Sequence, residues 1–238
     1  MIMDTMKNII STRLFRLGLP VTLLFCATFF IWLTDADLRL ARAAYQPGLG
    51  WYGIDRFPWD LLYTYAGAPA LLIAGLAGGI LLASFFRKHL AGQRKTALFF
   101  LLVLAVGPGL LVNLLFKDHL GRARPRELLE FGGQYPFTQI WQPGASGKNS
   151  SFPSGHASVA FYLFTPWFIL RRKNRAQAAC WLTGGLSYGS LVGAARILQG
   201  GHFLSDVLWA GGLVYLSGEI LAQLLALDRD SAPGGEQR

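Results

Sequence analysis

Long hydrophobic segments, separated by short polar connections, run through most of the chain. Predominantly apolar runs with few or no charged residues cover residues 15–33, 61–86, 97–116, 157–170, 176–195 and 203–227. A helix needs about 20 apolar residues to cross a bilayer, because each residue adds about 1.5 Å to its length. The pattern therefore predicts an all-α fold, a six-transmembrane helical bundle that forms one integral membrane domain over residues 1–238.

Two of the longer connections, 34–60 and 117–156, are rich in aromatic residues. Examples are Trp51 and Trp59 in the first and Tyr135 in the second. Trp and Tyr next to transmembrane helices usually form a belt at the lipid–water boundary, and we prefer this interpretation to substrate contact. We also expect residues 36–44 to form a short helix on the surface. The bundle should therefore carry an interfacial outer loop region.

Basic connections set the orientation. The loops 87–95 and 171–175 are basic and contain no acidic residue. Arg13 precedes the first run, and Arg16 is its second residue. By the positive-inside rule these segments are cytoplasmic, which predicts a multi-pass protein with both termini cytoplasmic. The first run is too long for a signal peptide, so we interpret it as a retained anchor.

Composition agrees with a membrane protein. Hydrophobic residues make up 53% of the chain, charged residues 15%, and the mean hydropathy is +0.37. A soluble domain carries about 25% charged residues. A soluble enzyme, a disordered chain and a disulfide scaffold are therefore excluded. The net charge of +9 would suggest nucleic acid in a soluble protein. Here much of it lies in the cytoplasmic loops, so we expect membrane lipids as partners and no nucleic acid.

Three clusters of ionisable residues lie at the ends of predicted runs. Residues 117–125 follow the third run, residues 152–156 precede the fourth, and residues 196–206 join the fifth to the sixth. The topology derived from the loop charges brings all three clusters to the outer face of the bundle. This shared position indicates a single site.

The first property of this site is its affinity for an anion. Lys117, Arg124 and Arg196 place three permanent cations together. Guanidinium groups match the oxygens of a phosphate with paired hydrogen bonds. Ser154 and Gly155 open a helix, whose free N–H groups also favour an anion. We expect a phosphate ligand and neither a metal nor a cofactor, because the side chains themselves offset the negative charge.

The second property is a pair of histidines. Asp206 lies four residues after His202, so on a helix it can hold one ring nitrogen and leave the other free to attack phosphorus. His156 could protonate the leaving oxygen and later activate water. The three residues therefore predict a two-step displacement through a phosphohistidine.

Other interpretations of these residues exist. His156, His202 and Asp206 are also common metal ligands, although the three nearby cations would repel a divalent ion. A non-catalytic lipid-phosphate binder or transporter would need the cations but not both histidines. We interpret His89 and His119 as packed or membrane-surface residues outside the site.

The spacing of the clusters resembles that of a known family. Lys117-x6-Arg124-Pro125, Pro153-Ser154-Gly155-His156 and Arg196-x5-His202-x3-Asp206 are similar to the three-part signature of the type 2 phosphatidic acid phosphatase superfamily, which includes the vanadium haloperoxidases. The resemblance implies a metal-independent phosphatase with an all-helical core. It makes His202 the nucleophile, Asp206 its support and His156 the acid. The implied phosphate-binding residues are Lys117, Arg124, Ser154, Gly155 and Arg196.

One position departs from the family pattern. The family often has Ser before the arginine of the third motif, and this chain has Ala195. A lost hydrogen bond of this kind costs about 1 kcal/mol, so it leaves the assignment in place.

The length of the fourth run favours a lipid substrate. Residues 157–170 span about 21 Å as a helix, less than the roughly 30 Å of a hydrocarbon core. Either Arg171 to Lys173 snorkel at the inner side, or His156 sits at the head-group level. Both place the pocket near lipid phosphates and disfavour soluble phosphate esters.

The family includes enzymes for lipid A, undecaprenyl diphosphate, phosphatidylglycerophosphate and phosphatidic acid. The segment 121–126, followed by Phe131-Gly-Gly, resembles the bacterial lipid A phosphatase-like group. Arg122 and Arg126 add charge that could meet a diphosphate, a second phosphate or anionic lipids.

We therefore predict hydrolysis of a lipid monophosphate or diphosphate at the periplasmic face of a bacterial inner (plasma) membrane. A lipid-to-lipid phosphotransferase that uses the same phosphohistidine is the alternative. The sequence leaves the lipid, the acceptor and the oligomeric state open.

Overall fold

The described part of the chain is mostly helical. The computed structural model describes residues 2–147 and 150–227, with the side chains of the first helix described from Leu14 on. The α-helices are α1 (Ile2–Leu33), α2 (Ala36–Ala44), α3 (Trp59–Tyr65), α4 (Ala68–Phe86), α5 (Arg94–Leu104), α6 (Lys117–His119), α7 (Gly155–Phe161), α8 (Pro166–Leu170), α9 (Arg175–Leu198) and α10 (Leu204–Leu224).

Shorter elements connect these helices. A π-helical segment, η2 (Ala105–Phe116), continues α5 into α6. The 3₁₀ turns are η1 (Lys88–Gln93), η3 (Pro125–Glu127), η4 (Leu129–Phe131) and η5 (Tyr162–Phe164). Two short antiparallel strands, β1 (Tyr45–Gln46) and β2 (Gly50–Trp51), form a small hairpin in which Tyr45 pairs with Trp51.

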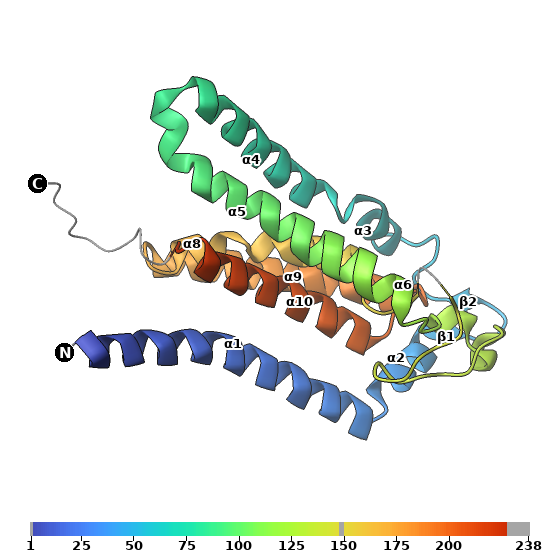
Figure 1. The fold of residues 1–238 in the computed structure, drawn as a ribbon. Coiled ribbons are helices and arrows are strands. Elements are labelled where there is room, and N and C mark those ends of the chain that lie inside the picture. Colours follow the sequence, from blue (N-terminus) through green and yellow to red (C-terminus); the bar gives the residue numbers. More distant parts are fainter. Residues whose placement is uncertain (1, 148–149, 228–238) are drawn as a thin grey trace, which may run out of the picture.

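The long helices run side by side, and the short elements gather at one end of them. Figure 1 shows α2, α6 and the β1–β2 hairpin at this end, beside the loop that follows α6. The start of α1, the α4–α5 connection and α8 lie at the opposite end. The predicted short helix over residues 36–44 is confirmed as α2, with the same bounds.

Among the described residues, four helical segments are long and apolar enough to cross a membrane. They are Leu14–Leu33, Trp59–Phe86, Lys88–His119 and Leu204–Leu224. They agree with four of the six predicted spans, and the protein is a membrane protein. The helical stretch Gly155–Leu170 is apolar but shorter, and α9 does not meet the same measure of length and apolarity. The predicted count of six spans is thus not confirmed, although helices occupy all six predicted positions.

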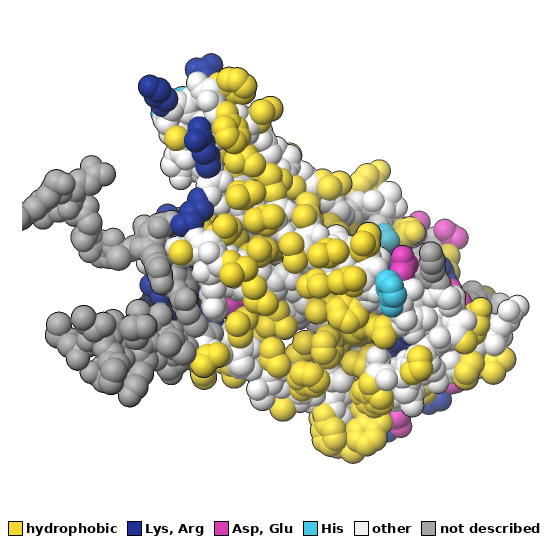
Figure 2. Space-filling model, in the orientation of Figure 1, with side chains coloured by type: hydrophobic (Ala, Val, Ile, Leu, Met, Phe, Trp, Pro, Cys, Tyr) yellow, Lys and Arg dark blue, Asp and Glu magenta, His cyan; other side chains and the backbone are white. Residues whose placement is uncertain are grey.

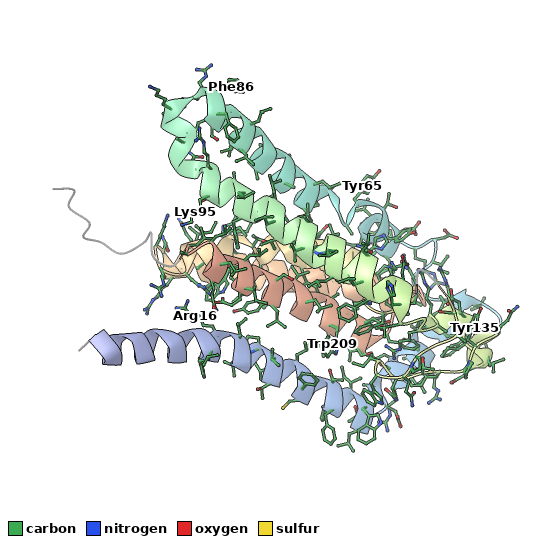
Figure 3. The ribbon with its side chains drawn as sticks, in the orientation of Figure 1. Arg16, Tyr65, Phe86, Lys95, Tyr135 and Trp209 are labelled. Carbon is green, nitrogen blue, oxygen red and sulfur yellow. The ribbon has the colours of Figure 1, made fainter. Side chains whose placement is uncertain are left out.

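The surface of the bundle is hydrophobic along its middle, as expected for a protein in contact with lipid. Hydrophobic side chains cover the middle of the face in Figure 2, whereas dark blue Lys and Arg side chains gather at the end that carries the α4–α5 connection. Figure 3 places Arg16 and Lys95 at this basic end and Tyr135 at the other. The two ends therefore differ chemically, with an apolar band between them.

A π-helical segment forms the second half of the third span and leads to Lys117. Pro108 lies inside η2, where its missing N–H breaks the regular ladder of hydrogen bonds. The side-chain Nδ2 of Asn113 donates to the carbonyl oxygen of Pro108 at 2.7 Å and so satisfies one backbone group. π-Helical turns are frequent at functional sites. Here the wide turns lead directly into Lys117.

Glycines allow α9 to pack closely against its neighbours. A Cβ at Gly185 would lie 2.4 Å from the backbone nitrogen of Phe164, and one at Gly189 would lie 2.2 Å from the ring of Phe161. A Cβ at Gly193 would lie 2.3 Å from Val207. Small residues at helix contacts let backbones approach in membranes. These three glycines therefore set how closely α9 packs against α7 and α10.

We expect Gly189→Ala to destabilise the protein by about 1–3 kcal/mol, because the added methyl group overpacks the contact with Phe161. Gly184→Ala is the matched control, since a Cβ there has nothing within 4 Å. Thermal unfolding in detergent should show a lower midpoint for Gly189→Ala alone. Equal midpoints for the two variants would contradict the packing account.

Candidate active site

The three predicted clusters converge at the end of the bundle that carries α2 and the loops. Lys117 follows η2, Gly155 begins α7, Arg196 lies in the last turn of α9, and His202 lies just before α10. A Cβ at Gly155 would lie 3.3 Å from the Nζ atom of Lys117 and 2.7 Å from Oδ1 of Asn113. Glycine leaves room for this approach, which places an ammonium group directly beside the start of α7.

A two-glycine turn positions His202. Gly200 has a φ of 64°, and a Cβ at Gly201 would lie 2.2 Å from a guanidinium nitrogen of Arg196. A left-handed backbone and a contact this close both favour glycine. The backbone N–H of Arg126 donates to the carbonyl oxygen of Gly200 at 3.1 Å and ties the turn to the first cluster. The turn therefore brings His202 and Arg196 together.

His202 is a neutral, oriented imidazole. Its Nδ1 lies 2.7 Å from the carbonyl oxygen of Ser151. A carbonyl can only accept, so Nδ1 carries the proton and Nε2 is left with its lone pair. Burial lowers the pKa of His202 to about 4, against the opposing effect of Asp206, which raises it. At neutral pH the ring is therefore uncharged and has one nitrogen available as a nucleophile.

Asp206 contacts His202 less directly than the sequence suggested. His202 precedes α10 rather than lying on it, and its Nδ1 is 3.7 Å from Oδ2 of Asp206. That oxygen accepts from the Ser151 hydroxyl at 2.5 Å and from the Phe203 backbone N–H at 2.7 Å. The predicted hydrogen bond to the ring is thus replaced by one to the Ser151 carbonyl. Asp206 acts on the ring through its charge.

His156 lies under an aromatic ring. The ring centroids of Tyr63 and His156 are 4.8 Å apart, and the guanidinium carbon of Arg196 lies 4.6 Å from the centroid of Tyr63. Arg124 and Lys117 are also close enough to interact electrostatically with His156. Tyr63, on α3, therefore joins the two histidine-bearing segments. Sequence reasoning missed it, because it belongs to none of the three clusters.

The cations of the site are crowded, and Arg196 is incompletely paired. Arg196 is 5% exposed, its Nη1 donates to the neutral side chain of Gln199, and its buried Nε has no hydrogen-bond partner among the described residues. Arg124 lies 4.0 Å from Glu127. Burial, followed by the nearby Arg126, lowers the pKa of Arg124. A buried cation without a full set of partners favours an anionic ligand.

Arg122 has a different role from either one considered from the sequence. It is 1% exposed, so it can meet neither a second phosphate nor surface lipids. Its Nη1 lies 2.5 Å from Asp206 and its Nη2 lies 2.9 Å from Asp37. The two carboxylates draw the guanidinium inward. Only Arg126 of this pair stays exposed.

The side chains of the two remaining histidines, His89 and His119, are exposed. The exposed His119 has its Nδ1 2.6 Å from the carbonyl oxygen of Leu115, and His89 belongs to η1 at the opposite end. In the described ranges, no group of three or more His, Cys, Asp or Glu side chains is arranged to hold a metal ion. The oxygens of Asp206 are engaged by Arg122, Ser151 and Phe203 instead.

Together these groups can bind a tetrahedral anion and attack it. Lys117, Arg124 and Arg196 supply positive charge around the start of α7, where Ser154 caps the helix by accepting from the Ala157 N–H at 3.4 Å. His202 supplies an unprotonated nitrogen, and His156 is a second imidazole nearby. The geometry fits transfer of a phosphoryl group.

Comparison with known proteins agrees with this chemistry. The chain is 34% identical over 217 residues to a lipid A 4′-phosphatase of Francisella tularensis subsp. novicida. The aligned region covers 88% of this chain and 94% of the relative. A lipid A 4′-phosphatase of Rhizobium etli is 31% identical over 222 residues, 90% of this chain and 81% of the relative.

A lipid A 1-phosphatase of Porphyromonas gingivalis is 29% identical over 108 residues, 45% of this chain and 23% of that protein. No solved structure matches the chain. The model of the PAP2 superfamily matches residues 96–226, which include all three clusters. The chain therefore belongs to the PAP2 superfamily and is a phosphatase of that type.

Proposed function

We propose that this protein removes a phosphate from lipid A by way of a phosphohistidine on His202. The observation that carries the proposal is the buried imidazole of His202, whose Nδ1 lies 2.7 Å from the Ser151 carbonyl oxygen and which interacts electrostatically with Lys117 and Arg196. The names of the relatives support lipid A as the substrate. The two long matches are to 4′-phosphatases and the 1-phosphatase match is short, which favours the 4′-phosphate.

In the first step the Nε2 lone pair of His202 attacks phosphorus, and the bond between phosphorus and the lipid oxygen breaks. The phosphate monoester binds with one proton, which passes to His156 and from there to the leaving oxygen, so the lipid departs as an alcohol. The imidazole becomes positively charged when the N–P bond forms. Asp206, whose Oδ2 lies 3.7 Å from Nδ1, stabilises that charge.

In the second step water replaces the histidine. The oxygen of a water molecule attacks phosphorus while His156, now neutral, takes a proton from that water. The bond between His202 and phosphorus breaks. The bonding pair returns to Nε2 of His202, which restores the neutral ring. Lys117, Arg124 and Arg196 offset the charge on the phosphoryl oxygens in both steps, which is the task a metal ion performs in other phosphatases.

An apolar groove beside the cationic site supports a lipid substrate. It has a volume of about 420 Å³ and is lined by aromatic and aliphatic side chains of α1, η2, α10 and the outer loop, among them Phe25, Phe29, Ile140 and Trp209. Figure 3 shows Trp209 between α1 and α10. Two further lining residues, Phe116 and Phe152, directly precede Lys117 and Pro153 in sequence. We assign this groove to an acyl chain of the lipid.

We further propose that six helices cross the membrane, the two additional spans being Gly155–Leu170 and α9. The basic end of the bundle then lies in the cytoplasm with both termini, following the positive-inside rule. The site at the opposite end faces the periplasm, at the outer surface of the inner membrane. Snorkelling of basic residues after Leu170 accommodates the short span.

Purified wild-type protein should release phosphate from lipid A in detergent, and mass spectrometry should show a product that lacks the 4′-phosphate. His202→Ala should lower this activity at least 1,000-fold, because it removes the nucleophile. His119→Ala is the matched control and should keep wild-type activity, since His119 is exposed and outside the site. Phosphate release by folded His202→Ala at the wild-type rate would refute the role of His202.

Removal of metal ions should leave the activity unchanged. The cations of the side chains perform the electrostatic task, so dialysis against EDTA should not lower the rate, and added Zn²⁺ should not raise it. Vanadate should inhibit, because it adopts the trigonal-bipyramidal geometry of phosphoryl transfer. Loss of activity in EDTA that Zn²⁺ restores would instead support His156, His202 and Asp206 as metal ligands.

A further inference from the structure

A buried ionic network lies behind the proposed nucleophile. Arg122 donates from Nε to the carbonyl oxygen of Thr138 at 2.9 Å and from Nη1 to Ser205 Oγ at 2.8 Å. Its other contacts are to Asp206 at 2.5 Å and to Asp37 at 2.9 Å. Its guanidinium carbon also lies 4.4 Å from the ring centroid of Phe203. Arg122 is thus held from several sides and bridges two carboxylates.

Asp37 brings the surface helix α2 into this network. It is 4% exposed and lies with Ala41 and Ala44 on the buried face of α2. Its Oδ1 accepts from the backbone N–H of Ser205 at 2.9 Å, and its Oδ2 accepts from the Ser205 hydroxyl at 2.5 Å. Ser205 directly precedes Asp206 in the first turn of α10. Asp37 therefore holds Arg122, which contacts Asp206, and also holds the helical turn in which Asp206 lies.

The charges of the network suit the proposed reaction. Asp37 and Asp206 carry two negative charges and Arg122 carries one positive charge, which leaves a net charge of −1 in the interior. His202 gains one positive charge when its N–P bond forms, beside Asp206. Without Asp37, the charge of Arg122 would cancel that of Asp206. The buried imidazolium would then lose its counter-charge in a site of low polarity.

We propose that Asp37 and Arg122 are positioning residues for phosphoryl transfer, which keep Asp206 oriented and negatively charged beside His202. This inference rests on the proposed role of His202 as the nucleophile. It makes α2, which lies outside the three motifs, a part of the catalytic apparatus.

A second ion pair provides a matched control. Arg42 of α2 contacts Glu130, with Nε of Arg42 and Oε1 of Glu130 2.5 Å apart. This pair also joins α2 to the loop after α6. It differs in being exposed, with side-chain exposures of 54% and 39%, and in lacking any contact to Asp206. Arg42→Gln therefore tests the docking of α2 without touching the charge near His202.

The test compares Asp37→Asn, Ser205→Ala and Arg42→Gln with the wild type. Initial rates are measured on lipid A and on a soluble chromogenic phosphomonoester, and folding is followed by size exclusion and thermal unfolding in detergent. We expect Asp37→Asn to lower kcat by on the order of tenfold or more, with KM within about twofold of wild type. Ser205→Ala should lower kcat in the same direction but less. Arg42→Gln should keep the wild-type kcat.

Several results would overturn the inference. They are a folded Asp37→Asn variant with wild-type kcat, a loss confined to KM, or an equal loss in Arg42→Gln. If Asp37→Asn does not fold, Ser205→Ala decides in the same way, because it removes two hydrogen bonds of the network without removing a charge. A wild-type protein that hydrolyses neither substrate would instead refute the proposed function itself, which separates the two failures.

Discussion

The carboxylate of Asp206 is buried in the first turn of a membrane helix, and the structure around the site depends on satisfying it. A buried charge is tolerated only where hydrogen bonds and an opposite charge compensate its loss of water. Arg122, the Ser151 hydroxyl and the Phe203 N–H meet this need. Each comes from a different segment, so folding Asp206 into the interior also fixes the loop of the second motif, the turn of His202 and the loop after α6.

Membrane insertion explains why these polar groups lie together. The middle of the bundle faces hydrocarbon, where an unsatisfied polar group costs several kcal/mol. Most charged groups therefore lie near the ends of the helices. At one end they form basic connections, and at the other they form the cradle of Lys117, Arg124 and Arg196 with two histidines. An apolar groove beside this cradle suits a molecule that has both a phosphate and acyl chains.

The sequence predicted the helices well, since apolar runs long enough to span a bilayer have few alternatives to helix. It also predicted that the three clusters meet, because each lies at a helix end on the same side. The sequence did not predict which residues outside the clusters contact the site residues. Arg122 and Asp37 are 85 positions apart, and nothing in either neighbourhood marks them as a pair. The Ser151 carbonyl that orients His202 and the ring of Tyr63 depend on how loops fold back over the site.

The central claim is that His202 carries the phosphoryl group during turnover. It is tested most directly by mixing the protein with lipid A, quenching at alkaline pH within the first turnover, and locating phosphate on peptides by mass spectrometry. The account predicts a phosphorylated His202 that appears before free phosphate and disappears as substrate is exhausted. Phosphate released from lipid A with no phosphorylated residue, or with phosphate on a residue other than His202, would contradict it.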